Sequence, residues 1–252
     1  AITPPPSFKE VLDTLWQQRA FRRIVTAFCF SYFFSMGIIQ WLPTFFIRSH
    51  DMETGELGTW LAFAWGVCGL FGAYLGGALT SRYAAGKEAW QMRAVAFAIA
   101  FAGLLFIMVY LSSNKYIALA LVAAVGFLFT LINGPVFAAI QSLATERIRS
   151  VTLALIFLLA NLIGFGLGPL TAGILSDLLT PRFGQESLRY ALLLLSPGYL
   201  LTAYCYWQAG ETIEADIRRV ETDIELTGGE APGDKLNALS LNAENTVDFN
   251  QP

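Results

Sequence analysis

The run "SVTLALIFLLANLIGFGLGPLTAGILS" (Ser150–Ser176) holds 27 consecutive residues without Asp, Glu, Lys or Arg. A helix needs about 20 apolar residues to cross about 30 Å of hydrocarbon. Helices of soluble proteins are seldom apolar on every face over that length. The stretch therefore predicts a transmembrane helix. Its alternating glycines, Gly164, Gly166 and Gly168, suggest one other interpretation, a dinucleotide-binding turn.

The context of these glycines opposes nucleotide binding. The dinucleotide fingerprint needs a preceding strand and an acidic residue about 20 positions on, within a βαβ unit, and "GFGLG" has neither. Gly164 and Gly168 instead form a GxxxG pair, which allows close helix contact in lipid. The region from 57 to 81 repeats this spacing at Gly72 and Gly76, followed by Gly77. Close packing alone would explain most of these glycines, and in a transporter small residues would also allow the helices to slide or rock.

Five further uncharged windows accompany this one, and all six exceed 20 residues. Only 14% of the chain is charged, against about 25% in an ordinary soluble domain. A β-barrel would show short alternating strands instead. The sequence therefore predicts an all-α polytopic membrane protein whose region 24–210 holds six transmembrane helices, at about 24–47, 57–81, 94–114, 116–141, 150–177 and 190–208.

The basic residues between the windows predict the orientation. Twelve of the 16 Lys and Arg fall on the side that includes both ends of the region, and four (Arg48, Lys115, Arg182 and Arg189) fall on the other. Because short cytoplasmic segments collect Lys and Arg, both termini are expected in the cytoplasm, with the protein in a bacterial inner membrane. Residues 1–23 read as an amphipathic lead-in on the membrane surface. Residues 211–252 read as an acidic cytoplasmic tail, disordered after Gly228.

Polar side chains at membrane depth are the candidates for substrate contact. They are Tyr32, Ser35 and Gln40 in the first window, Asn133 in the fourth and Asn161 in the fifth. Each asparagine has an alternative role as interhelical hydrogen-bond glue. No window has an ionisable carboxylate or base near its centre, although proton-driven carriers normally use one.

Prolines predict irregular helix inside the windows. Asn133-Gly134-Pro135 should weaken its helix, because proline lacks a backbone donor, and Pro43, Pro169 and Pro197 offer further bends. The three scattered cysteines and single histidine have no metal-ligand spacing and predict neither a metal nor a cofactor. Asp177, at the outer end of the fifth window, reads as an exposed cap or a partner of Arg182 or Arg189, with a gating role as the alternative.

These features together resemble the C-terminal half of a major facilitator superfamily transporter. The resemblance rests on the six helices, the basic lead-in and the glycine-rich second helix ending in "GGALTSRY". The family's loop signature, Gly-x-Leu-x-Asp-Arg, is matched at Gly77, Leu79 and Arg82, with Ser81 in place of the aspartate. The resemblance implies a 12-helix fold of two halves, each made of two three-helix inverted repeats. It also implies that an N-terminal six-helix half precedes this chain, which does not begin with Met.

A narrower resemblance covers "GPLTAGILSDLLTPRFGQESLRYALLLL" (Gly168–Leu195), which is similar to bacterial members of the spinster-like branch. That branch implies an amphipathic or lipid-like substrate, while other branches carry organic anions, sugars and drugs. The resulting hypothesis is a secondary active transporter with alternating access, a small-molecule substrate at mid-membrane and a proton gradient as its driving force. The alternatives are a non-transporting six-helix assembly subunit and an intramembrane enzyme. The enzyme would require paired acids or a Ser–His pair at membrane depth, which the windows lack.

Overall fold

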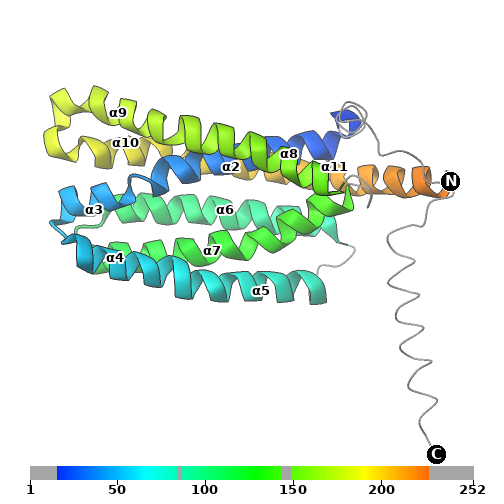
Figure 1. Cartoon of the computed structure of the whole chain (residues 1–252), viewed down its shortest axis with the longest axis horizontal. Helices are drawn as coiled ribbons and strands as arrows, with labels where there is room; N and C mark the ends of the chain where they lie inside the picture. The colour runs from blue at the N-terminus through cyan, green and yellow to red at the C-terminus, as the bar shows by residue number, and fades with distance from the viewer. Residues whose placement is uncertain (1–15, 84–86, 144–148, 227–252) are drawn as a thin grey trace, which may run out of the picture.

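The computed structural model describes residues 16–83, 87–143 and 149–226, and in these ranges the chain folds into a bundle of long, roughly aligned helices (Figure 1). The elements in chain order are α2 (Arg19–Ile39), α3 (Leu42–His50), α4 (Thr54–Ala62), the π-helix η1 (Phe63–Val67), α5 (Cys68–Tyr83), α6 (Glu88–Leu111), α7 (Lys115–Ser142), α8 (Arg149–Asn161), the π-helix η2 (Leu162–Leu167), α9 (Gly168–Phe183), the 3-10 turn η3 (Gly184–Glu186), α10 (Ser187–Leu195) and α11 (Gly198–Leu226).

These elements make six membrane-length rods. Within the described ranges, five helical stretches are long and apolar enough to cross a membrane, and the last of them, Arg149–Arg219, is 71 residues long. That stretch turns back at η3, so that α9 and α10 lie side by side (Figure 1). It therefore supplies two of the six rods. The predicted all-α, six-helix fold is confirmed.

The rods pack as two inverted three-helix repeats. The second rod (α4, η1, α5) packs on the fourth (α7), and the fifth (α8, η2, α9) packs on the first (α2). The third and sixth rods, α6 and α11, pack on each other. The sequence carries the same relation, since Gly37, Gly72 and Gly77 recur at a nearly constant offset as Gly134, Gly168 and Gly173.

Glycines bring the α5 and α7 backbones into contact. A Cβ at Gly72 would collide with the Phe127 carbonyl, and one at Gly76 would collide with the Leu131 carbonyl. Pro135 explains the second contact, because it has no N–H to bond the carbonyl four residues earlier, at Leu131. This carbonyl lies against Gly76, where a weak Cα–H···O contact can form.

The fifth rod packs on α2 in the same way, through glycines of η2 and α9. A Cβ at Gly168 would lie 2.5 Å from the Phe33 carbonyl oxygen and 2.9 Å from the Gly37 nitrogen. A Cβ at Gly164 would lie 2.8 Å from the Tyr32 Cβ. Gly77 and Gly166 differ, because a Cβ at either position would meet nothing within 4 Å. The structure thus leaves no room for a Cβ at Gly72, Gly76, Gly164 or Gly168, whereas a Cβ at Gly77 would have room.

Three of the four prolines considered lie at helix ends, and the fourth lies inside a helix. Pro43 lies in the first turn of α3, Pro169 in the first turn of α9, and Pro197 between α10 and α11, as bends require. Pro135 lies inside α7, which continues as one helix from Lys115 to Ser142. The proline therefore leaves the Leu131 carbonyl without its usual donor but does not end the helix. Irregular turns occur instead in η1 and η2, one in each repeat.

Hydrogen bonds between α2 and α11 stabilise the beginning of α2. Asp216 is buried, and its carboxylate accepts a 2.6 Å hydrogen bond from the Ala20 backbone nitrogen. Arg23 donates 2.6 Å to the Gln208 carbonyl. A carboxylate at a helix N-terminus satisfies a free N–H and complements the helix dipole. Most of the predicted lead-in (residues 1–15) and the tail after residue 226 lie outside the described residues.

The glycine contacts predict different costs for two nearly adjacent substitutions. Gly168→Ala should destabilise the protein by about 1–3 kcal/mol, because its methyl group must displace backbone atoms of α2. Gly166→Ala is the matched control and should lose less than about 0.5 kcal/mol, because its methyl group enters open space. Thermal unfolding in detergent measures both. Equal losses at the two positions would contradict the close contact at Gly168.

Candidate functional site

A cavity of about 180 Å³ lies between the middles of α2 and α7. Its polar lining consists of hydroxyl groups and one amide, and the rest is aromatic and aliphatic. The residues are Phe28, Ser31, Tyr32, Ser35, Met36 and Ile39 of α2, Trp65 of η1, Phe129, Thr130, Ile132, Asn133 and Val136 of α7, and Tyr206 of α11. Three of the five predicted substrate contacts, Tyr32, Ser35 and Asn133, therefore meet in one cavity.

Tyr32 is half-buried and held from two sides. Its ring centroid lies 4.8 Å from that of Phe28, one helical turn earlier. Gly164 of η2 approaches its Cβ closely enough that a methyl group at Gly164 would be 2.8 Å away. The GxxxG segment of the fifth rod thus sets the position of a cavity side chain.

Ser35 forms a hydrogen bond to the interior of the bundle. Its side chain is buried, and its Oγ accepts a 3.4 Å hydrogen bond from the Tyr199 hydroxyl of α11. Tyr199 is fully buried and stacks on Phe106, with ring centroids 5.6 Å apart. Since a buried hydroxyl needs a partner, Ser35 satisfies Tyr199 as well as lining the cavity.

Asn133 and Trp65 face the cavity from the other side. Asn133 is exposed on α7, one turn from Phe129, and within the described residues its amide makes no recorded hydrogen bond. Its position is compatible with contact to a ligand in the cavity. Trp65 belongs to the π-helix η1, and single π-turns often occur at functional sites.

Gln40 and Asn161 lie outside this cavity. Gln40 is exposed in the turn between α2 and α3. Asn161 is exposed at the end of α8, and its Nδ2 donates a 2.7 Å hydrogen bond to the Phe157 carbonyl of its own helix. The structure does not bring either residue to Tyr32 and Asn133.

The charged gating candidates lie at opposite ends of the bundle. Arg82 is exposed in the last turn of α5. Asp177 is exposed on α9 and lines an outer groove of about 260 Å³ together with Arg48 and Trp41. Arg189, one of the predicted partners of Asp177, pairs instead with Glu186 at 2.8 Å. Trp41 anchors this groove, donating a 2.9 Å hydrogen bond to the Pro169 carbonyl.

The cavity is suited to binding and gives no sign of bond-breaking chemistry. Its described lining contains no Asp, Glu, Lys, Arg or His. Within the described ranges no three His, Cys, Asp or Glu side chains gather closely enough to hold a metal ion. Pockets with mostly apolar walls and a few placed polar groups are typical of small-molecule sites.

Comparison with known proteins gives the family. The model of the Major Facilitator Superfamily matches residues 2–169 of the chain. The chain belongs to the major facilitator superfamily. This superfamily member is 30% identical over 176 residues to an MFS-type efflux pump of Mycolicibacterium smegmatis, an alignment that covers 69% of the chain and 41% of the pump. The chain therefore belongs to a family of membrane transport proteins and not to a family of enzymes.

Two solved structures share the fold. Both are of a bacterial homologue of the human lysosomal transporter Spinster in an inward-facing conformation, one unoccupied and one occupied. They align with TM-scores of 0.72 and 0.67 at 19% and 20% identity, and cover 83% and 80% of the chain. The chain covers 51% of each of them. At this identity the match shows the fold.

Sequence patterns missed several of the residues that line the cavity. Trp65 lies in the middle of a glycine-rich window and carries no periodic signal, and only the π-helix brings it over the cavity. Tyr206 comes from α11, a peripheral rod, and is almost fully buried. The sequence did offer one signal for Tyr206. It is a tyrosine deep inside an uncharged window, and its hydroxyl needs a partner there.

The Tyr199–Ser35 bond predicts a coupled effect on stability. Ser35→Ala should cost about 1 kcal/mol, because it leaves the Tyr199 hydroxyl buried without its acceptor. Tyr199→Phe combined with Ser35→Ala should cost less than the sum of the two single changes. Denaturant unfolding in mixed micelles measures this cycle. Strict additivity would show that Ser35 does not support Tyr199.

Proposed function

We propose that this chain is the C-terminal half of a secondary active transporter that works by alternating access. The main observation in support of this proposal is the cavity between α2 and α7 that Tyr32 and Asn133 line. Binding near the bilayer midplane at a repeat interface is typical of secondary transporters. The chain spans 41% of the efflux pump and 51% of the Spinster homologue, which supports a second half of similar size.

The surface of α5 is suited to contact with that second half. Leu70, Phe71 and Tyr74 are 71%, 61% and 72% exposed, although they lie beside the contact glycines. On the related fifth rod, Leu162 and Leu170 are 68% and 57% exposed. The two flanking rods would then pack against the N-terminal half, leaving α2 and α7 between them to face a shared central cavity.

The driving force is proposed to be a proton gradient. The described cavity lining contains no group that ionises near neutral pH. Proton-coupled carriers use an intramembrane carboxylate or histidine, so the coupling group would belong to the N-terminal half. The C-terminal half would change conformation when the coupling group in the N-terminal half gains or loses a proton, and its own cavity residues would not titrate.

The substrate is proposed to be amphipathic. Aromatic and aliphatic walls would hold a hydrocarbon portion, and the Asn133 amide and the hydroxyls would contact a polar portion. An organic anion is the weaker candidate, because no described cation lines the cavity. A non-transporting assembly subunit would have no use for the mid-bundle cavity.

The proposed location is the bacterial inner membrane, with both termini in the cytoplasm, and it can be tested by labelling. In a version of the protein without its native cysteines, Ser112→Cys should react with an impermeant maleimide added outside intact cells. Ser150→Cys, exposed at the opposite end of the bundle, should react only after the cells are opened. The reverse pattern would contradict the proposed orientation.

Transport itself is predicted to depend on Asn133. In liposomes holding the full-length protein, a fluorescent lysophospholipid should move faster under a pH gradient, and carboxyfluorescein should not. Asn133→Leu should reduce this movement about tenfold or more, because the amide contacts the polar portion of the substrate. Asn161→Leu is the matched control and should keep most activity, since Asn161 lies outside the cavity.

Two outcomes would contradict this proposal. Movement of the lysophospholipid that is unchanged when the pH gradient is collapsed would exclude proton coupling. Equal loss of transport and of folded protein in Asn133→Leu would make Asn133 a structural residue.

A further inference from the structure

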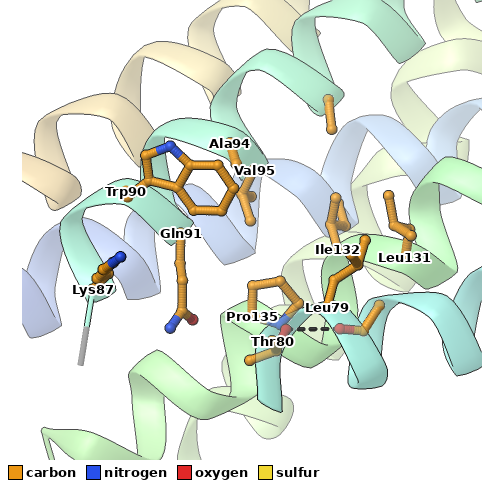
Figure 2. A pocket seen from close by; sticks show the side chains of 12 residues that line it. Leu79, Thr80, Lys87, Trp90, Gln91, Ala94, Val95, Leu131, Ile132 and Pro135 are labelled. Carbon is orange, nitrogen blue, oxygen red and sulfur yellow. Dashed lines mark hydrogen bonds between the residues drawn. The ribbon is translucent and has the colours of Figure 1, made fainter. Parts of the chain in front are cut away.

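A second and larger hollow lies between α5 and α6, and Ile132 of α7 separates it from the central cavity by lining both. Its volume is about 490 Å³, within the range of about 300–1,000 Å³ typical of ligand pockets. Gly76, Leu79 and Thr80 of α5 form one wall, α6 forms the other, and Leu131, Ile132 and Pro135 of α7 form the floor. We name this hollow the α5–α6 groove (Figure 2).

The groove has a polar end and an apolar end. Lys87 immediately precedes α6, and Trp90 and Gln91 lie in its first turn, near the end of the bundle where α5 ends (Figure 2). Val95 and Ile132 lie deeper and offer only hydrocarbon. Thr80 adds little polarity, because its hydroxyl already donates to the Gly76 carbonyl at 2.7 Å.

The second repeat shows that the fold does not require this opening. Thr80 of α5 corresponds to Ser176 of α9, in the similar strings "GALTS" and "GILSD". Ser176 is buried and lies 3.2 Å from the Ser187 hydroxyl of α10, which also accepts a 3.1 Å hydrogen bond from Thr180. There α9 packs directly on α10, whereas α5 and α6 each pack on α7 with the groove between them. The space between α5 and α6 in the first repeat is therefore open, whereas α9 and α10 fill the corresponding space in the second repeat.

Basic and aromatic side chains mark the polar end. Lys87 is exposed at the start of α6, and Arg82 is exposed in the last turn of α5, one turn beyond Leu79. Trp90 is 61% exposed, and tryptophan at this depth is typical of the lipid headgroup region. Glu88, the acid in the first turn of α6, does not line the groove. The mouth therefore complements a negative charge, and the interior complements an acyl chain.

We propose that the α5–α6 groove binds an anionic phospholipid of the adjacent leaflet, with its phosphate at Lys87 and an acyl chain over Val95 and Ile132. Basic pockets between transmembrane helices are a known means of holding anionic headgroups. The bound lipid separates α5 from α6 and so supports the contact of α5 with α7. The groove shares Ile132 with the central cavity but opens between α5 and α6, and its occupation does not require that the chain transport anything.

Fluorescence quenching of Trp90 tests this site directly. The purified full chain is placed in phosphatidylcholine nanodiscs containing increasing fractions of phosphatidylglycerol with brominated acyl chains, or of phosphatidylcholine brominated in the same way. The Trp90 signal is the difference between the protein and its Trp90→Phe variant. Brominated phosphatidylglycerol should quench Trp90 at about a fivefold lower fraction, since one basic residue contributes about 1 kcal/mol near anionic lipid.

Three variants distinguish a built site from ordinary lipid contact. Lys87→Gln should remove most of the preference for phosphatidylglycerol, while Arg22→Gln, an equal loss of charge at the same end of the bundle, should leave it unchanged. Ala98→Phe should fill the groove and protect Trp90, while Trp207 on α11 is still quenched.

Two results would overturn the proposal. If both lipids quench Trp90 equally and Lys87→Gln has no effect, Trp90 meets only ordinary boundary lipid. If neither lipid quenches Trp90 while Trp207 is quenched, protein covers the groove. Lys87 is exposed and its replacement should not disturb folding, so the test stands even if Ala98→Phe fails to fold.

Discussion

Carbonyl oxygens that rest against glycines hold together the two helix pairs on which this bundle depends. Lipid offers no hydrophobic force to bring helices together, so contact must come from packing and weak polar interactions. Gly72 meets the Phe127 carbonyl and Gly168 meets the Phe33 carbonyl, at positions that correspond in the two repeats. Each contact fixes a flanking rod against α7 or α2, and these are the two helices that wall the central cavity.

The same contacts tie the cavity to elements that can move. In each repeat a π-helix precedes the glycines of the flanking rod, and η1 carries Trp65 to the cavity while η2 carries Gly164 to Tyr32. A glycine surface without side chains can slide or tilt with little steric resistance. Motion of the flanking rods would therefore change the cavity directly, as alternating access requires.

The sequence predicted the fold well, because lipid imposes a simple rule on length and charge. Uncharged windows located all six rods, and the family signature at Gly77, Leu79 and Arg82 indicated the superfamily. Helix breaks were harder to predict. Pro135 was expected to weaken α7, which nevertheless continues past it, and no residue pattern predicted η1 or η2.

The site was predicted in part. The sequence shows which residues in a window are polar, but it does not show the direction in which each side chain points. Tyr32, Ser35 and Asn133 meet in the cavity, while Gln40 and Asn161 were equally polar and lie outside it. Gly77 shares the spacing of the contact glycines but faces open space. These distinctions depend on the rotation of each helix about its axis, which tertiary packing sets.

Reaction of a cysteine at position 133 with a membrane-impermeant maleimide tests the central claim most directly. In the full-length protein in membranes, Asn133→Cys should react, and an amphipathic substrate should protect it, because a water-accessible cavity lies between α2 and α7. Phe97→Cys, on the outer surface of α6, should remain unreacted in lipid. Reaction at 97 with none at 133 would contradict the cavity and the function built on it.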